Sequence, residues 1–235
     1  NTNKKVAIIG SGVAGLTSAR ELFRYGHKVD IFEKHKTPGG MLNQGIPIFR
    51  LPRKIIEREI KQILSLGIKL HLNKNISTFK QLNALASDYD AVVLAMGTLQ
   101  ANKINKQFSM CEQVEDGLDF LLRTNEYNSK TIGDNVVIIG GGYTSMDCAR
   151  TALRLGAKSV RTFYRRTRGD LVILPGELEE LKKEHGVMKF NARPNEIIMK
   201  RGKLSGLQLI KTQITNKGEL EDIRGSEFNI KTDHI

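Results

Sequence analysis

One supersecondary pattern occurs twice in this chain, about 130 residues apart. In each copy a short apolar segment leads into a glycine-rich turn and then into a segment with helical spacing. The first copy comprises Lys5–Ile9, the turn with Gly10, Gly12 and Gly15, and a helix to Tyr25. The second comprises Asn135–Ile139, the turn with Gly140, Gly141 and Gly142, and a helix to Leu155. Each continues into another strand, 28–33 or 159–164, so the sequence predicts two βαβ units and an α/β fold.

The remaining segments fill in two domains around these units. Apolar spacing predicts helices over 53–66, 79–85 and 177–184, and strands over 68–72 and 91–95. Short strands at 187–191, 196–200 and 205–214, separated by turn residues, predict an antiparallel meander. We expect one nucleotide-binding domain over residues 1–125 and a second over 126–235, joined near 101–130.

Composition excludes several classes of protein. The 235 residues are 40% hydrophobic and 26% charged, which is typical of a folded globular chain. The only cysteines, Cys111 and Cys148, form neither a C-x-x-C redox pair nor a four-thiolate cluster. The five histidines show no metal-ligand spacing, so no metal site is expected.

The net charge of +12 allows an anionic cofactor or an acidic protein partner. Nucleic-acid binding is not expected, because aromatic residues make up only 6% of the chain and no basic run is interleaved with them. No apolar run approaches the roughly 20 residues of a membrane helix. We therefore expect a soluble, cytoplasmic protein without membrane insertion.

The first glycine turn has the context that makes a G-x-G-x-x-G motif specific. Gly10 permits the tight turn, Gly12 lets a pyrophosphate approach the backbone, and Gly15 allows the helix to pack closely on the sheet. Glu33 ends the next strand, where a carboxylate would accept hydrogen bonds from ribose hydroxyls. A glycine-rich turn of some other α/β fold is the alternative interpretation.

The second glycine turn differs in two ways. Ser145 stands where the third glycine would be, and the following strand ends in Tyr164-Arg165-Arg166-Thr167-Arg168 instead of an acid. Guanidinium groups bind a 2′-phosphate that a carboxylate would repel, so this turn favours NADP(H) over NAD(H). A solvated basic turn after an edge strand is the alternative.

Further motifs resemble a known family. The segments Pro38-Gly39-Gly40-Met41-Leu42, Gly45–Pro52, Asp90–Gly97, Gly117–Leu121 and 140–168 resemble the glutamate synthase small (beta) chain family. They are also similar to the flavin/NADPH portions of dihydropyrimidine dehydrogenase and NAD-linked ferredoxin:NADP oxidoreductase. The resemblance implies two Rossmann-like domains of the glutathione-reductase type and an oxidoreductase with FAD and NADP(H) as cofactors. It also implies a flavin domain that is incomplete at the C-terminus of this sequence, finished by a downstream segment or by another polypeptide.

Carried over residue by residue, the resemblance implies two sets of contacts. Those to FAD fall on Gly10, Gly12, Val13, Ala14, Gly15, Glu33, Gly40, Met41, Leu42, Arg50 and Ile76. Those to NADP(H) fall on Gly140, Gly141, Gly142, Tyr143, Thr144, Arg165, Arg166 and Arg168. Three positions depart from the family: Tyr143 replaces an Asn or Asp, Leu174 replaces an Arg, and Gln44 replaces a Tyr.

The resemblance also implies the reaction. Hydride transfer between NADPH and a flavin is carried by the cofactors, so no catalytic side chain is predicted. Electrons would pass on to an iron–sulfur protein or subunit, either ferredoxin-like or a large catalytic subunit, in a hetero-oligomer. Two alternatives remain: a thioredoxin-reductase-like enzyme without its C-x-x-C, and a fragment or non-catalytic NADP(H)-binding docking module.

Overall fold

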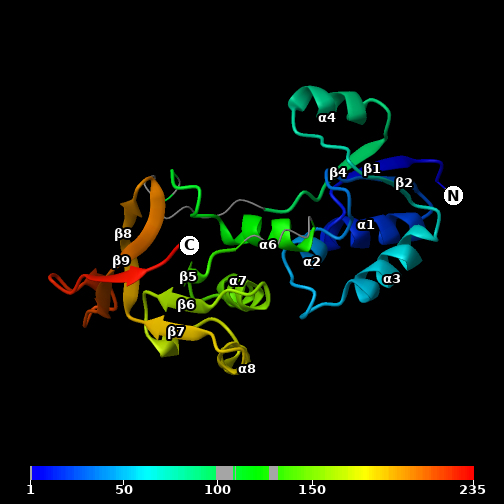
Figure 1. Cartoon of the computed structure of the whole chain (residues 1–235). Helices are drawn as coiled ribbons and strands as arrows, with labels where there is room; N and C mark the ends of the chain where they lie inside the picture. The colour runs from blue at the N-terminus through cyan, green and yellow to red at the C-terminus, as the bar shows by residue number, and fades with distance from the viewer. Residues whose placement is uncertain (1, 99–107, 109, 127–131) are drawn as a thin grey trace. The chain divides into compact units, whose positions relative to one another are not determined.

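The computed structural model describes residues 2–98, 108, 110–126 and 132–235 (Figure 1). The chain divides into two compact units, Asn1–Gln100 with Asn125–Tyr127, and Ala101–Thr124 with Asn128–Ile235. This division differs from the expected boundary after residue 125. The reason is that helix α6 (Gly117–Asn125) buries Phe120 and Leu121 in the core of the second unit.

The first unit contains a four-stranded parallel sheet in the order β3-β2-β1-β4. Its elements, in chain order, are β1 (Lys5–Ile9), α1 (Val13–Arg24), β2 (Lys28–Phe32), α2 (Met41–Gln44), α3 (Arg53–Leu64), β3 (Lys69–His71), α4 (Phe79–Ala86) and β4 (Ala91–Leu94). Ile9 pairs with both Phe32 and Leu94, so the carboxyl ends of the three strands lie level. The glycine turn after β1 therefore opens at one edge of the sheet.

The core of this unit explains the helical spacing. Ile8 and Ile31 of the sheet are fully buried. Leu16 of α1, with Ile56 and Ile60 of α3, belongs to the same cluster, so both helices pack on one apolar layer. Helix α2 was not predicted, because four residues are too few to show helical periodicity.

The second unit is built on a three-stranded parallel sheet in the order β5-β6-β7. Its elements up to this sheet's last strand are β5 (Asn135–Ile139), α7 (Tyr143–Arg154), β6 (Ser159–Tyr164), the 3₁₀ turn η1 (Arg168–Asp170), α8 (Pro175–Lys183) and β7 (Val187–Phe190). The assignment of 187–191 to the meander was wrong, since β7 pairs in parallel with β6 from Arg161↔Val187 to Tyr164↔Phe190. Helix α8 supplies the crossover that a parallel pair requires.

An antiparallel meander follows. It comprises β8 (Ala192–Lys200), β9 (Lys203–Ile214), β10 (Leu220–Asp222) and β11 (Phe228–Lys231). Strands β8, β10 and β11 each pair with β9. The predicted strands 196–200 and 205–214 are present, but β8 begins earlier, and β10 and β11 were not predicted.

Each face of the parallel sheet has its own cover. Val136 and Val160 pack with Met146 of α7 and Leu181 of α8. Val137 and Phe163, which alternate with them along β5 and β6, pack with the leucines of the meander instead. The strands of this sheet are therefore buried on both sides, as is typical of parallel sheets.

Residues 232–235 lie along β5. The backbone N–H of Val137 donates to the His234 carbonyl at 2.9 Å, and Val136 forms a parallel bridge with His234. In the described part of the chain, no helix has the length and apolar character needed to cross a membrane.

An ion cluster fixes this segment to α6. Glu115 accepts from Arg123 Nε at 2.9 Å and lies 2.6 Å from His234 Nε2. Burial works to raise the pKa of Glu115, but the hydrogen bonds from Arg123 and His234 outweigh it and hold that pKa at about 2.

This pKa predicts how stability depends on pH. A carboxyl whose pKa falls from about 4.5 when unfolded to about 2 when folded stabilises the protein above pH 4.5. That contribution, up to about 3 kcal/mol, is lost as the pH falls from 4.5 to 2. Urea unfolding of Glu115→Gln across this range should show a flatter pH dependence than the parent. The exposed Asp134→Asn should behave like the parent, and a parent-like slope in Glu115→Gln would contradict the assignment.

Candidate functional site

Each of the three glycines of the first turn is a glycine for a different structural reason. Gly10 has a φ of +103°, and a Cβ there would overlap the Ala95 carbonyl oxygen. A Cβ on Gly15 would overlap the Gly10 carbonyl oxygen. A Cβ on Gly12 would meet only the Cα of Gly40, at 4.0 Å. Folding thus requires Gly10 and Gly15, whereas Gly12 borders open space.

Helix α1 begins at this open space. Gly12 is its N-cap and supplies no side-chain acceptor, while Val13 and Ala14 in the first turn are exposed. The first N–H groups of a helix have no partner within the helix, and they lie at its positive end. An anion is the natural ligand for such a helix start.

Glu33 lies beside the turn and is 4% exposed. Its Oε2 accepts from the backbone N–H of Ser11 at 2.9 Å and from Ser11 Oγ at 2.6 Å. Its Oε1 accepts from the backbone N–H of His35 at 2.9 Å. Sequence reasoning missed Ser11, whose only signal is its place between the first two glycines.

A second glycine pair meets the first turn. The backbone N–H of Gly39 donates to the Ser11 carbonyl at 3.0 Å, and a Cβ on Gly40 would lie 2.8 Å from the Cα of Gly12. Met41, exposed, and Leu42, half-buried, follow in α2. The structure therefore brings the 10–15 turn, Glu33 and 40–42 together.

Two other predicted FAD residues occupy neighbouring segments. Arg50 is half-buried in the turn before α3, and Ile76 is half-buried after β3. Their contacts with a flavin stay predictions.

Arg53 organises the segment that follows α2, and sequence reasoning did not single it out. Its guanidinium donates to the carbonyls of Leu42 at 3.0 Å and Ile46 at 2.9 Å. Burial lowers the pKa of Arg53 from its ordinary value. The Arg53 guanidinium therefore supplies hydrogen bonds to backbone carbonyls in and after α2, a helix too short to pair them itself.

The second glycine turn repeats the arrangement. Gly140 has a φ of +144°, a Cβ on Gly141 would overlap the ring of Tyr164, and a Cβ on Gly142 would meet nothing within 4 Å. Tyr143 and Thr144 are exposed at the start of α7, as Val13 and Ala14 are in α1. Gly142, like Gly12, borders open space.

Ser145 replaces the third glycine at little cost. Its Oγ donates to the Gly142 carbonyl at 2.7 Å, within the turn itself. The side chain therefore satisfies its own hydrogen bond while the helix stays close to the strand.

The arginine segment after β6 is held through its backbone. The Arg165 carbonyl accepts from Thr212 Oγ1 at 2.6 Å, and the Arg166 carbonyl accepts from the backbone N–H of Asn191 at 3.2 Å. Among the described residues, neither guanidinium has a carboxylate within ion-pair distance. Arg168 Nη2 lies 3.9 Å from Oε1 of Glu179. Asp170 is close enough to Arg166 that, beside the hydrogen bond from Thr167, the charge of Arg166 lowers the pKa of that carboxyl.

The two cysteines do not form a redox pair. Both are free and buried, and Cys148 lies on α7. Burial raises the pKa of the Cys148 thiol, so it stays protonated and unreactive near neutral pH.

Together, these features fit two dinucleotides. Each unit offers a glycine turn and a helix start facing open space, one beside the buried Glu33 and one beside Arg165 and Arg166. The donors at the helix starts suit a pyrophosphate, and the arginines suit a further phosphate.

The chain matches the family described as "Pyridine nucleotide-disulphide oxidoreductase" over residues 4–221. It is 36% identical to the "Glutamate synthase [NADPH] small chain" of Escherichia coli K12, covering 100% of this chain and 53% of that protein. It is 34% identical to the "NADP(+)-dependent formate dehydrogenase subunit beta" of Moorella thermoacetica, covering 100% of this chain and 34% of that subunit. The chain thus spans about half the length of one relative and a third of the other.

Among solved structures, FprA of Mycobacterium tuberculosis in complex with NADPH matches with a TM-score of 0.82 and 19% identity, covering 99% of this chain and 69% of that one. The shared fold confirms the predicted pair of glutathione-reductase-type folds. The predicted resemblance and the predicted dependence on FAD and NAD(P)H are confirmed by the family match. With its two glycine turns and parallel sheets, the chain belongs to the pyridine nucleotide-disulphide oxidoreductase family.

Proposed function

We propose that this chain passes electrons between NADP(H) and FAD and on to an iron–sulfur partner, as the nucleotide-binding part of a hetero-oligomer similar to glutamate synthase. FAD is assigned to the first unit and NADP(H) to the second, refining the expected domains 1–125 and 126–235. The relatives support an assembly, because their names describe a small chain and a beta subunit.

One observation carries the assignment of the cofactors. Within the two glycine turns, Gly12 and Gly142 are the glycines at which an added Cβ would have room, and each is the N-cap of the helix that follows. The groups that follow have opposite charge, Glu33 in the first unit and Arg165 with Arg166 in the second. Opposite charge at equivalent positions favours two different dinucleotides.

In the first unit, the N–H groups of Val13 and Ala14 would receive the FAD pyrophosphate. Ser11 and His35 orient the Glu33 carboxylate, which retains acceptor capacity for ribose hydroxyls. Arg53 holds the backbone of 42–46, next to the glycines that approach the cofactor.

In the second unit, Tyr143 and Thr144 would contact the NADP(H) pyrophosphate through the start of α7. Arg165 and Arg166 would bind the 2′-phosphate, with their backbone fixed by Thr212 and Asn191. When bound, the flavin supplies the hydride and electron-transfer chemistry, so the side chains bind and orient.

Two alternatives remain distinguishable. A thioredoxin-reductase-like reaction is disfavoured, because this chain lacks the C-x-x-C that would receive electrons. A non-catalytic docking module would bind NADPH without reducing a flavin. Anaerobic addition of NADPH to the FAD-loaded protein decides: loss of the flavin's visible absorbance supports the proposal, and its persistence favours the docking module.

The open glycines give a paired prediction. Gly12→Val should remove FAD binding and spare NADPH binding, while Gly142→Val should do the reverse, since each side chain fills only its own pyrophosphate space. Flavin fluorescence and calorimetric titration with NADPH measure the two affinities.

A folding control accompanies this pair. The cofactor-free Gly12→Val and Gly142→Val variants should unfold near the parent temperature. Gly15→Ala should unfold earlier, because its Cβ overlaps the Gly10 carbonyl oxygen. If Gly12→Val still bound FAD, the assignment of FAD to the first glycine turn would be contradicted.

Nucleotide choice is tested at the arginines. Each lost charge-assisted contact costs about 1.5–3 kcal/mol, so Arg165→Ala and Arg166→Ala should each weaken NADPH binding about ten- to 150-fold. NADH affinity should change little, because NADH lacks the 2′-phosphate. The exposed Arg224→Ala is the matched control. Equal losses for both nucleotides would contradict the assignment.

The partner is tested through the charge of +12. Reduction of a ferredoxin-like acidic partner should slow as ionic strength rises, because salt screens electrostatic steering. The reduction of bound flavin by NADPH should change less in the same stopped-flow series. A rate of partner reduction that does not change with ionic strength would contradict docking of an acidic partner.

A further inference from the structure

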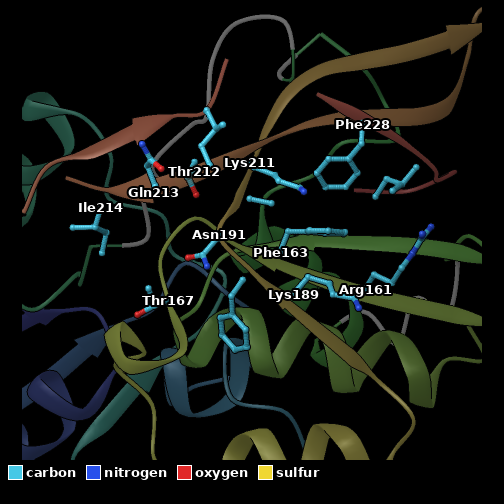
Figure 2. Close-up of a pocket in the computed structure, with 14 residues that line it drawn as sticks. Arg161, Phe163, Thr167, Lys189, Asn191, Lys211, Thr212, Gln213, Ile214 and Phe228 are labelled. Carbon is cyan, nitrogen blue, oxygen red and sulfur yellow. The ribbon is translucent and has the colours of Figure 1, made fainter. Parts of the chain in front are cut away.

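The second unit contains a pocket of about 690 Å³ between its parallel sheet and its meander. Figure 2 shows Phe163 and Lys189, from β6 and β7, facing Lys211 and Phe228, from β9 and β11. Of the residues predicted to bind NADP(H), none lines it, although Thr167 at its wall belongs to the arginine segment.

The wall is largely apolar. Three phenylalanines and three isoleucines contribute to it. The rings of Phe163 and Phe228 lie 6.4 Å apart and inclined at 50°. Ile214 and Ile223 are each 37% exposed there. A concave apolar surface of this size is typical of a small-molecule site.

The charged groups of the wall all have one sign. They are Arg161, Lys189 and Lys211, and none of the described residues that line the pocket is an Asp or a Glu. Arg161 donates one N–H to the Lys231 carbonyl, while its Nε is buried without an acceptor among the described residues. Asp222, on the neighbouring strand β10, is held by Arg193, with 2.7 Å from Oδ1 to Nε. The buried Nε of Arg161 and the exposed ammonium groups of Lys189 and Lys211 could therefore donate hydrogen bonds to an anionic group.

We propose that this pocket is a second ligand site, separate from the NADP(H) site, for a small molecule that joins an aromatic ring to an anionic group. The ring would pack against Phe163 and Phe228, and the anion would meet Arg161, Lys189 and Lys211. The apolar wall favours the ring and the basic residues exclude a cationic ligand.

The pocket also reaches the arginine segment. Thr212 and Asn191 both line it and both hold the backbone of that segment, at the carbonyls of Arg165 and Arg166. A ligand touching them is therefore coupled to NADP(H) affinity, and by linkage NADP(H) changes the affinity of the pocket by the same factor. This coupling rests on the proposed function, whereas the pocket itself does not.

The test uses 8-anilinonaphthalene-1-sulfonate, an anionic aromatic dye whose fluorescence rises in an apolar site. One dye per folded full chain should bind. Lys189→Glu with Lys211→Glu should weaken it about tenfold or more, since charge-assisted contacts are lost and repulsion is added. Lys203→Glu with Lys217→Glu, exposed lysines of the meander outside the pocket, is the control of equal charge.

A neutral analogue, N-phenyl-1-naphthylamine, separates charge from apolar packing and from misfolding. It should bind the parent and the Lys189/Lys211 variant about equally. Equal weakening of the sulfonate in both lysine pairs, or many dyes per chain, would overturn the proposal by showing surface adsorption.

The dinucleotide itself is the other source of an anion-bearing ring. Added 2′,5′-ADP should change the affinity for the dye to a limiting value, which shows two coupled sites. Complete displacement at saturation would show one shared site and overturn the proposal. If 2′,5′-ADP does not bind at all, the proposed function fails while dye binding still tests the pocket.

Discussion

The close approach of a helix to the strand before it governs both nucleotide folds. In the first unit Gly15 allows α1 to lie against the Gly10 carbonyl, which leaves no room for a Cβ. In the second unit Ser145 reaches a similar position and donates to the Gly142 carbonyl. This packing aims the start of each helix across the end of its sheet, and the open space at Gly12 and Gly142 follows from it.

Elements with strong local signals could be predicted from the sequence. The strands 5–9 and 135–139 and the helices that follow their glycine turns lie where the pattern placed them. Strand β7 was misassigned because four residues of moderate apolarity do not reveal whether their partner runs parallel or antiparallel. The pairing depends on α8 carrying the chain across the sheet. Short β10 and β11 depend on β9 in the same way.

The candidate site shows the same limit. The glycines and Arg165 could be predicted because the spacing of a motif reflects the backbone conformation that the turn requires. Ser11 and Arg53 are not, since their partners, Glu33 and the carbonyls of Leu42 and Ile46, are identified only in three dimensions. A buried carboxylate and a buried guanidinium each need several hydrogen bonds, and no sequence pattern specifies which backbone groups supply them.

The charged groups of the two sites differ in burial as well as in sign. Glu33 is buried, and hydrogen bonds from three donors offset the free-energy cost of burying its carboxylate in the absence of a ligand. Arg165 is exposed and keeps its guanidinium in water, with only its carbonyl fixed by Thr212. A rigid acceptor suits neutral hydroxyls, whose weak bonds reward preorganisation. A hydrated cation suits a phosphate, whose charge attracts it over a longer range. Under the proposed assignment, one fold would discriminate two dinucleotides by how each charged group is held.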